Sequence, residues 1–216
     1  MLLRPENPDR RKREAATRLV LMGTLAECGL GFVAFGGGWL FGVPIREQFH
    51  WGLWEIGKGL LAVLPMLIIL CLVELTPGKV FQRLRALVDF LIGPLLSSAR
   101  IPELALLSFA AGLGEEVFFR GFIQTGLLQL LPNDGLVTGT LWESPAVAIV
   151  VAAILFGAAH PLSPLYIILT AVMGAYLGLL FHWTGNLLIP IVAHGVYDFI
   201  ALLYLARFRR RRSTPD

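Results

Sequence analysis

The stretch that decides the fold is residues 57–75, GKGLLAVLPMLIILCLVEL, whose charged residues are Lys58 near its start and Glu74 near its end. About 20 predominantly apolar residues are what an α-helix needs to cross the hydrocarbon core of a bilayer. A helix of a soluble core is usually shorter and carries a polar face. The stretch therefore predicts a transmembrane helix.

The rest of the chain has the same character. Of its 216 residues 56% are hydrophobic and 15% are charged, whereas soluble domains average about 25% charged residues. We therefore predict an all-α fold, a polytopic membrane bundle of about six transmembrane helices plus one interfacial amphipathic helix. The expected spans are 17–41, 57–75, 102–131, 145–160, 165–183 and 187–205, and the amphipathic helix is 79–100.

Basic residues gather at the two ends of the chain. Six of the 18 Lys and Arg residues lie in the first 18 positions, and five more lie within 207–212. Basic clusters beside apolar spans stay in the cytoplasm and attract anionic lipids. We therefore expect basic cytoplasmic tails at 1–16 and 207–216, a membrane domain at 17–206, lipid contacts at both tails and no nucleic-acid partner. The expected location is the plasma (inner) membrane if the source is bacterial.

The most polar cluster of the predicted spans contains Glu115, Glu116 and Arg120, and Arg120 is the one basic residue within 101–206. A charge at mid-membrane costs about 2.5–3.5 kcal/mol on insertion scales, so each such residue needs a reason. Glu116 and Arg120 lie about 40° apart on a helix and can form an ion pair. Glu115 lies about 140° from Arg120, which leaves it available for another role. Glu27, in the first span, is a lone carboxylate that we expect to face another helix or water.

Two further predicted helices carry histidines. His160 ends the helix at 145–160, while His194 and Asp198 are four residues apart and share one face of the last helix. This set of residues can bind a metal ion or activate a water molecule. From composition and spacing alone three interpretations stay open: catalysis, transport of ions or protons, and hydrogen bonds that only hold helices together.

Three motifs occur in order on separate apolar helices. Residues 115–120 read EEVFFR (EExxxR), residues 156–160 read FGAAH (FxxxH), and residues 194–198 read HGVYD (HxxxD). In this order they resemble the CPBP family of intramembrane proteases, which includes the type II CAAX prenyl proteases and bacteriocin self-immunity proteins. The resemblance covers residues 101–205 and implies a catalytic core there.

The resemblance also implies roles for residues. Glu115 and His160 would activate a water molecule for attack on a peptide carbonyl, and His194 with the residue four positions later would stabilise the oxyanion. The supporting residues of the predicted site are Glu116, Arg120 and Phe156. The family is often labelled metalloprotease, and Glu115, His160 and His194 are acceptable zinc ligands in number and type. A divalent metal such as zinc therefore stays open as a cofactor, although the chain has no HExxH spacing.

The last motif departs from the family, because the residue that is commonly Asn is Asp198 here. An ionised Asp cannot donate a hydrogen bond to an oxyanion. Either burial keeps Asp198 protonated, or Asp198 orients His194, which then acts alone. We expect the second, because the spacing of four residues serves it directly.

The predicted function is that of an intramembrane endopeptidase acting on a peptide or protein substrate, which in one branch of the family is lipidated. Two alternatives remain. One is a non-catalytic member of the same fold that serves as an immunity factor or membrane scaffold. The other is a proton-coupled transporter, for which a two-fold internal similarity would be expected, and the sequence has none.

Overall fold

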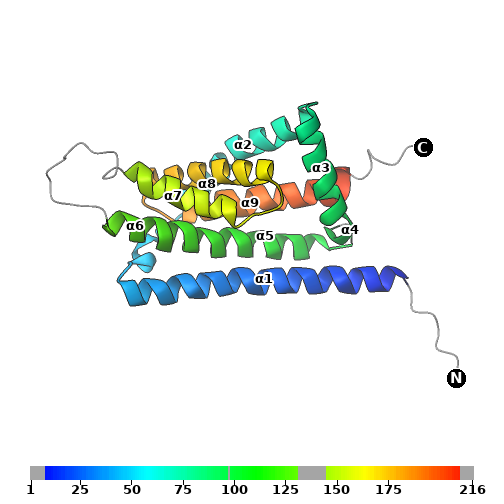
Figure 1. The fold of residues 1–216 in the computed structure, drawn as a ribbon. Coiled ribbons are helices and arrows are strands. Elements are labelled where there is room, and N and C mark those ends of the chain that lie inside the picture. The colour runs from blue at the N-terminus through cyan, green and yellow to red at the C-terminus, as the bar shows by residue number, and fades with distance from the viewer. Residues whose placement is uncertain (1–7, 97, 131–144, 210–216) are drawn as a thin grey trace, which may run out of the picture.

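The structure is a computed structural model that describes residues 8–96, 98–130 and 145–209, and every regular element within these ranges is a helix. Most of the helices run side by side along one direction, as Figure 1 shows. The predicted all-α membrane bundle is confirmed. Residues 1–7, 131–144 and 210–216, which hold parts of both tails and the predicted loop at 132–144, lie outside the described residues.

Four helices are long and apolar enough to cross a membrane, judged by length and composition. They are α1 (Pro8–Phe41), α2 (Leu53–Leu75), α8 (Pro164–Thr184) and α9 (Leu188–Tyr204). Large apolar side chains on their outer faces are exposed. Phe32 is 79% exposed, Trp39 86% and Leu53 87%. A bilayer would cover such a surface, since lipid tails are as apolar as these side chains.

The two other expected spans differ from these four. Residues 101–130 are helical throughout, but as α5 (Ile101–Glu116), the π-helical η2 (Val117–Gln124) and α6 (Thr125–Leu130). Helix α7 (Pro145–Ala158) has 14 residues. At 1.5 Å per residue it is about 21 Å long, less than the roughly 30 Å of a hydrocarbon core. The total of six spans therefore stays a prediction.

The predicted amphipathic helix at 79–100 is present in two pieces, α3 (Lys79–Leu91) and α4 (Gly93–Leu96). Pro94 accounts for the break, because it has no backbone N–H to bond to the carbonyl of Phe90, four residues earlier. Helix α3 lies across one end of the bundle (Figure 1). Its Leu84 is buried, and its Arg85 donates hydrogen bonds to the carbonyls of Val73 and Thr76 at the end of α2.

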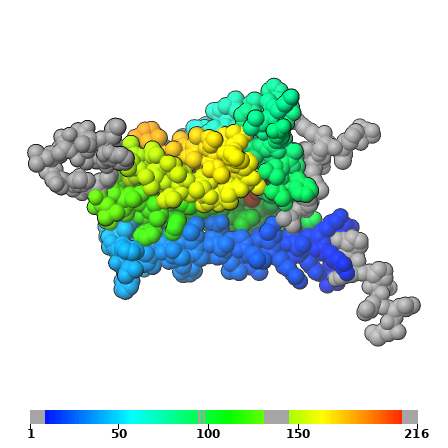
Figure 2. All heavy atoms as spheres, in the orientation of Figure 1, coloured from blue at the N-terminus to red at the C-terminus, as the bar shows by residue number. Residues whose placement is uncertain are grey.

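Helix α5 is the centre of the packing. It packs against α9 and α1, while α7 packs against α8 and α2 against α9. Figure 2 shows α1 as a layer along one side of the molecule, and Figure 1 shows α5 between α1 and the other long helices.

Two glycines permit the close approach of α5 to both neighbours. A Cβ atom at Gly112 would lie 2.7 Å from the backbone nitrogen of Gly195 on α9. At Gly114 a Cβ atom would collide with the backbone oxygen of Glu27 on α1. Glu115 follows directly and is therefore held where α5 is packed on both sides.

Candidate active site

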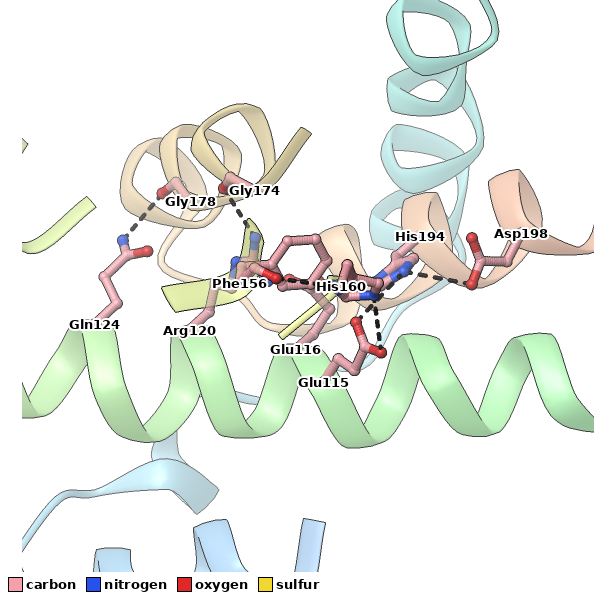
Figure 3. A network of polar contacts seen from close by, with 10 residues as sticks. All are labelled: Glu115, Glu116, Arg120, Gln124, Phe156, His160, Gly174, Gly178, His194 and Asp198. Carbon is pink, nitrogen blue, oxygen red and sulfur yellow. Dashed lines mark hydrogen bonds and ion pairs between the residues drawn. The ribbon is translucent and has the colours of Figure 1, made fainter. Parts of the chain in front are cut away.

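The polar residues of the three motifs come together on one side of α5. Glu115, Glu116 and Arg120 point from α5 and η2 toward α8 and α9, away from α1 (Figure 3). His160 lies just beyond the end of α7, and His194 and Asp198 lie on α9. The four residues expected to be catalytic are thus brought into one cluster by three separate segments.

The Glu115 carboxylate lies between the two imidazoles. Its Oε1 is 3.7 Å from Nε2 of His160, and its Oε2 is 4.0 Å from Nε2 of His194. Both separations exceed the range of a direct hydrogen bond. Separations of this size suit a bridging water molecule, which can bond to both groups at once. The cluster can therefore hold a water between a carboxylate and an imidazole.

His160 has a defined orientation. Its Nδ1 lies 2.8 Å from the carbonyl oxygen of Phe156, four residues earlier. A carbonyl only accepts hydrogen bonds, so Nδ1 carries the hydrogen and donates it. In the neutral imidazole Nε2 is then an acceptor, and it faces Glu115. The FxxxH motif thus uses its Phe backbone to fix the tautomer of its His.

His194 is oriented by a residue from another helix. Its Nδ1 lies 2.9 Å from Oε1 of Glu116, and its Nε2 lies 3.5 Å from Oδ2 of Asp198. The contact with Asp198 fits the expected spacing of four residues, but the Glu116 contact is the shorter one. Glu116 is therefore the closer orienting group, whereas Asp198 contacts the nitrogen that faces Glu115.

The ion pair expected between Glu116 and Arg120 is present and almost fully enclosed. Nη1 of Arg120 lies 2.9 Å from Oε1 of Glu116, and the side chains are 1% and 0% exposed. Nη2 of Arg120 donates to the carbonyl of Gly174 on α8 at 2.8 Å. The guanidinium also lies over the Phe156 ring, with Cζ 4.6 Å from the ring centroid. Arg120 thus joins η2, α7 and α8 and holds the carboxylate that orients His194.

On α8, the residues that accept the hydrogen bonds from η2 are glycines. Gln124, four residues after Arg120, donates to the carbonyl of Gly178, four residues after Gly174, at 3.0 Å (Figure 3). An added Cβ atom at Gly178 would lie 2.8 Å from Oε1 of Gln124. Arg120 and Gln124 of η2 therefore donate hydrogen bonds to the carbonyls of two glycines on successive turns of α8.

The backbone of the segment after Glu116 forms a wider helix than an α-helix, because η2 is π-helical. In η2 the backbone N–H of Thr125 bonds to the carbonyl of Arg120, five residues earlier, and the Thr125 hydroxyl donates to the same oxygen at 2.9 Å. Such π-helical turns are frequent at functional sites. The helix predicted at 102–131 is present over its described residues, and its π-helical segment was not predicted.

A cavity of about 240 Å³ opens beside the cluster. Phe156, His160, His194 and Asp198 contribute to its wall, and Glu115 lies directly behind the two histidines. Apolar side chains of α2, α3, α8 and α9 form most of the remainder, including Met66, Ile69, Leu70, Val88, Leu169 and Met173. The polar cluster is therefore open to an apolar space among the helices.

Comparison with known proteins agrees with this arrangement. Residues 97–200 match the family model described as type II CAAX prenyl endopeptidase Rce1-like. This part of the chain is similar to the Rce1-like family. The match runs from just before α5 into α9, so the Rce1-like segment contains every residue of the cluster, and the predicted family resemblance is confirmed.

One curated relative is similar to the chain. It is the uncharacterized protein YpbD of Bacillus subtilis (strain 168), which is 32% identical over 126 residues. The match covers 56% of this chain and 56% of YpbD, so the chain spans about half the length of that relative. No solved structure matches the chain.

The Rce1-like segment does not present a metal centre in this arrangement. Within the described residues no group of three or more His, Cys, Asp or Glu side chains is placed so that it could hold a metal ion. Glu115 separates the two imidazoles, and each Nε2 faces a different oxygen of its carboxylate. The proposed set of Glu115, His160 and His194 as zinc ligands does not fit this geometry.

Two further residues lie near the cluster, and the sequence analysis did not assign either of them to the site. Glu27 lies on α1, outside the Rce1-like segment, and its Oε2 is buried without a hydrogen-bond partner among the described residues. Tyr166 lines the cavity, and its ring centroid is 6.3 Å from that of His160. The sequence feature that could have pointed to Tyr166 as a site residue is its position in the first turn of the helix that begins shortly after His160.

Proposed function

We propose that this chain is a membrane-embedded endopeptidase in which Glu115 and His160 activate the water that hydrolyses a peptide bond. The observation that carries the proposal is the position of the Glu115 carboxylate, 3.7 Å and 4.0 Å from the Nε2 atoms of two histidines beside a cavity. The similarity of the 97–200 segment to the Rce1-like family supports peptide hydrolysis as the reaction class.

In the first step the water lies between Oε1 of Glu115 and Nε2 of His160. Its oxygen forms a bond to the carbonyl carbon while a proton passes to the Glu115 carboxylate. The π electrons of the carbonyl move to its oxygen, which becomes an oxyanion. His160 accepts a hydrogen bond from the water at Nε2 and thereby aims the lone pair of the water at the carbon.

The oxyanion needs hydrogen-bond donors. In its doubly protonated form His194 donates from Nε2, while its Nδ1–H remains bonded to Glu116. The Glu116–Arg120 pair keeps that imidazole in place. Asp198, when ionised, only accepts hydrogen bonds, so it helps to position His194 and gives nothing directly to the oxyanion.

In the last step the carbon–nitrogen bond breaks. Its electron pair stays on the nitrogen, which takes the proton held by Glu115, and the carbonyl forms again. The products are one carboxylic acid and one amine, and a single water is consumed. Glu115 is a carboxylate once more and can serve the next cycle.

The cavity indicates the kind of substrate. Its wall is mostly apolar, so it suits an apolar side chain or part of a lipid attached to the substrate. A peptide with an apolar or lipidated segment that lies in the bilayer would enter from the surrounding lipid. We place both tails of the enzyme in the cytoplasm, in contact with anionic lipids, and in the plasma membrane if the source is bacterial.

The test is cleavage of a peptide library by the detergent-purified full chain. The library contains matched peptides with and without a prenyl group, and the variants are Glu115→Gln, His160→Ala and His182→Ala. His182 is exposed and lies outside the cluster, so His182→Ala is the matched control.

We expect wild type and His182→Ala to cleave and both cluster variants to lose activity by about 10²-fold or more. No cleavage by correctly folded wild type would reject the endopeptidase and favour a non-catalytic scaffold.

A further inference from the structure

We infer that the hydroxyl group of Tyr166 donates a hydrogen bond to the oxyanion and so takes the place of the donor that Asp198 does not supply. The inference rests on the proposed function. It makes Tyr166 a catalytic residue of the hydrolysis, acting together with His194 on the same oxygen.

The chemical need comes from the composition of the cluster. A tetrahedral intermediate is stabilised by donors aimed at its oxyanion, and more than one donor is common. In the cluster Glu115, Glu116 and Asp198 are acceptors when ionised, and Arg120 is turned away toward Gly174. That leaves Nε2 of His194 as the donor from the three motifs. A second, uncharged donor would strengthen the site without changing its net charge.

Tyr166 is fixed at the edge of the cluster by the start of α8. The Ser163 hydroxyl oxygen caps this helix by accepting a hydrogen bond from the backbone N–H of Tyr166 at 3.2 Å. Pro164 restricts the first turn further. Only five residues separate Tyr166 from His160, so the same short turn sets the positions of both side chains.

Tyr166 lies in the wall of the same cavity as the two histidines. Its ring centroid is 6.3 Å from that of His160, and both residues line the cavity together with His194 and Asp198. Tyr166 is also near enough to Asp198 and Glu115 to interact with both electrostatically. From this wall the hydroxyl can reach into the space in which the reacting carbonyl would lie.

The hydroxyl of Tyr166 is also a free donor. The interactions of Tyr166 within the described residues run through its backbone and its ring, and none involves the hydroxyl. By contrast, the hydroxyl of Tyr176 donates to the carbonyl of Ala62 at 2.8 Å, and that of Tyr204 donates to Glu74 at 3.2 Å. A phenol that lines a cavity without a partner can donate to a ligand at no loss of another bond.

Tyr176 provides a matched control. Its hydroxyl donates to the carbonyl of Ala62 on α2 at 2.8 Å, and Tyr176 is not among the described residues that line the cavity. Its ring packs in the apolar cluster that α2, α8 and α9 form around Met66 and Met173. Tyr176→Phe therefore removes the same atom as Tyr166→Phe at a position outside the site.

The experiment measures kcat and KM of the full chain on a peptide that wild type cleaves. The variants are Tyr166→Phe, Tyr176→Phe, Asp198→Asn and the double variant Tyr166→Phe/Asp198→Asn, with Glu115→Gln as the reference for lost chemistry. Thermal unfolding of each variant checks that equal amounts of folded protein are compared.

We expect Tyr166→Phe to lower kcat by about 10²-fold, within the range for loss of an oxyanion donor, with KM changed less than about threefold. Tyr176→Phe should keep the wild-type kcat. Asn at position 198 carries an N–H donor, so Tyr166→Phe should lower kcat at least tenfold less in the Asp198→Asn background.

Two results would overturn the inference while the proposed function stands: wild-type kcat in Tyr166→Phe, or the same loss in both backgrounds, with Glu115→Gln inactive in each case. Full activity in Glu115→Gln would instead reject the proposed function itself.

Discussion

Glu115 and Glu116 are adjacent in the sequence and have opposite surroundings. Glu116 accepts bonds from Arg120 and His194 on the same oxygen, Oε1, so its position is fixed from two sides. Glu115 has no partner within 3.5 Å among the described residues and faces two imidazole nitrogens. One turn of helix thus supplies both a structural anion and a reactive one.

The first prediction at this scale concerns Arg120. Arg120→Ala leaves Glu116 as a buried anion without its cation, which typically destabilises a protein by about 3–5 kcal/mol. We therefore expect a much smaller folded fraction, measured by size-exclusion chromatography and thermal unfolding in detergent.

The matched control is Arg10→Ala. Arg10 pairs with Glu14 at the same spacing of four residues, but its side chain is 73% exposed. Surface pairs contribute about 0–1 kcal/mol, so this variant should unfold like wild type. Equal behaviour of the two variants would contradict a structural role for the buried pair.

The second prediction concerns metal removal. Among the described residues no three suitable side chains surround one point, so the derived mechanism uses no metal ion. Cleavage by protein incubated with excess chelator and then dialysed should keep the rate of untreated protein. A loss of activity that added zinc restores would show that the side chains rearrange around a metal in the working enzyme.

Among the elements, the limits of the spans were largely predictable from the sequence. The run at 57–75 and the breaks near Pro161–Pro164 and Gly185 predict helix ends within a few residues of α2, α8 and α9. Apolar length and turn residues act locally, so they can be read from one stretch of chain. The Glu116–Arg120 pair was predictable for the same reason.

Contacts between distant elements were not predictable in this way. Glu116 and His194 are 78 residues apart, and nothing in either motif shows that their side chains meet. The parallel bonds of Arg120 and Gln124 to Gly174 and Gly178 depend on how α8 is placed against η2. The width of η2 likewise follows from this packing, because the apolar pattern of residues 117–124 also suits a regular helix.

The third prediction tests the packing of α1 on α5. Gly114→Ala should destabilise the protein by about 1–3 kcal/mol, because its Cβ atom would collide with the backbone of Glu27 and cannot be accommodated by a side-chain movement. Gly29→Ala on α1 is the control, since a Cβ atom there has nothing within 4 Å. Thermal unfolding of both variants measures the difference. A Gly114→Ala protein as stable as Gly29→Ala would contradict this packing.

At the scale of the whole molecule, the first long helix begins and the last one ends on the same side of the bundle. The start of α1 and the end of α9 are at the end of the bundle that also holds α3 and α4 (Figure 1). Ala16, Leu96 and Ala206 pack there in one apolar cluster, and Arg207 donates to the carbonyl of Ala99. The described basic residues at the start of α1 and just after α9 are thus at one end of the bundle, which supports the proposal that both tails are cytoplasmic.

The fourth prediction is that the start of α1 faces the cytoplasm and that the segment after its end faces the opposite side of the membrane. In a chain with Cys28 and Cys71 replaced by Ala, single cysteines are introduced as Arg10→Cys and Glu47→Cys. Both positions are exposed, Arg10 near the start of α1 and Glu47 six residues past its end. A membrane-impermeant maleimide added to intact cells should label the Glu47→Cys protein, and should label the Arg10→Cys protein only after the membrane is opened. Labelling of both from the same side would contradict an α1 that spans the bilayer.

The central claim is that the Glu115 carboxylate is the base that activates water. The most direct measurement is the single-turnover rate of peptide cleavage by the purified full chain, with enzyme in excess, for wild type, Glu115→Gln and the exposed control Glu47→Gln. The account predicts that Glu115→Gln cleaves at least about 10³-fold more slowly while it unfolds like wild type, and that Glu47→Gln cleaves at the wild-type rate. A folded Glu115→Gln protein that cleaves within tenfold of wild type would contradict the account.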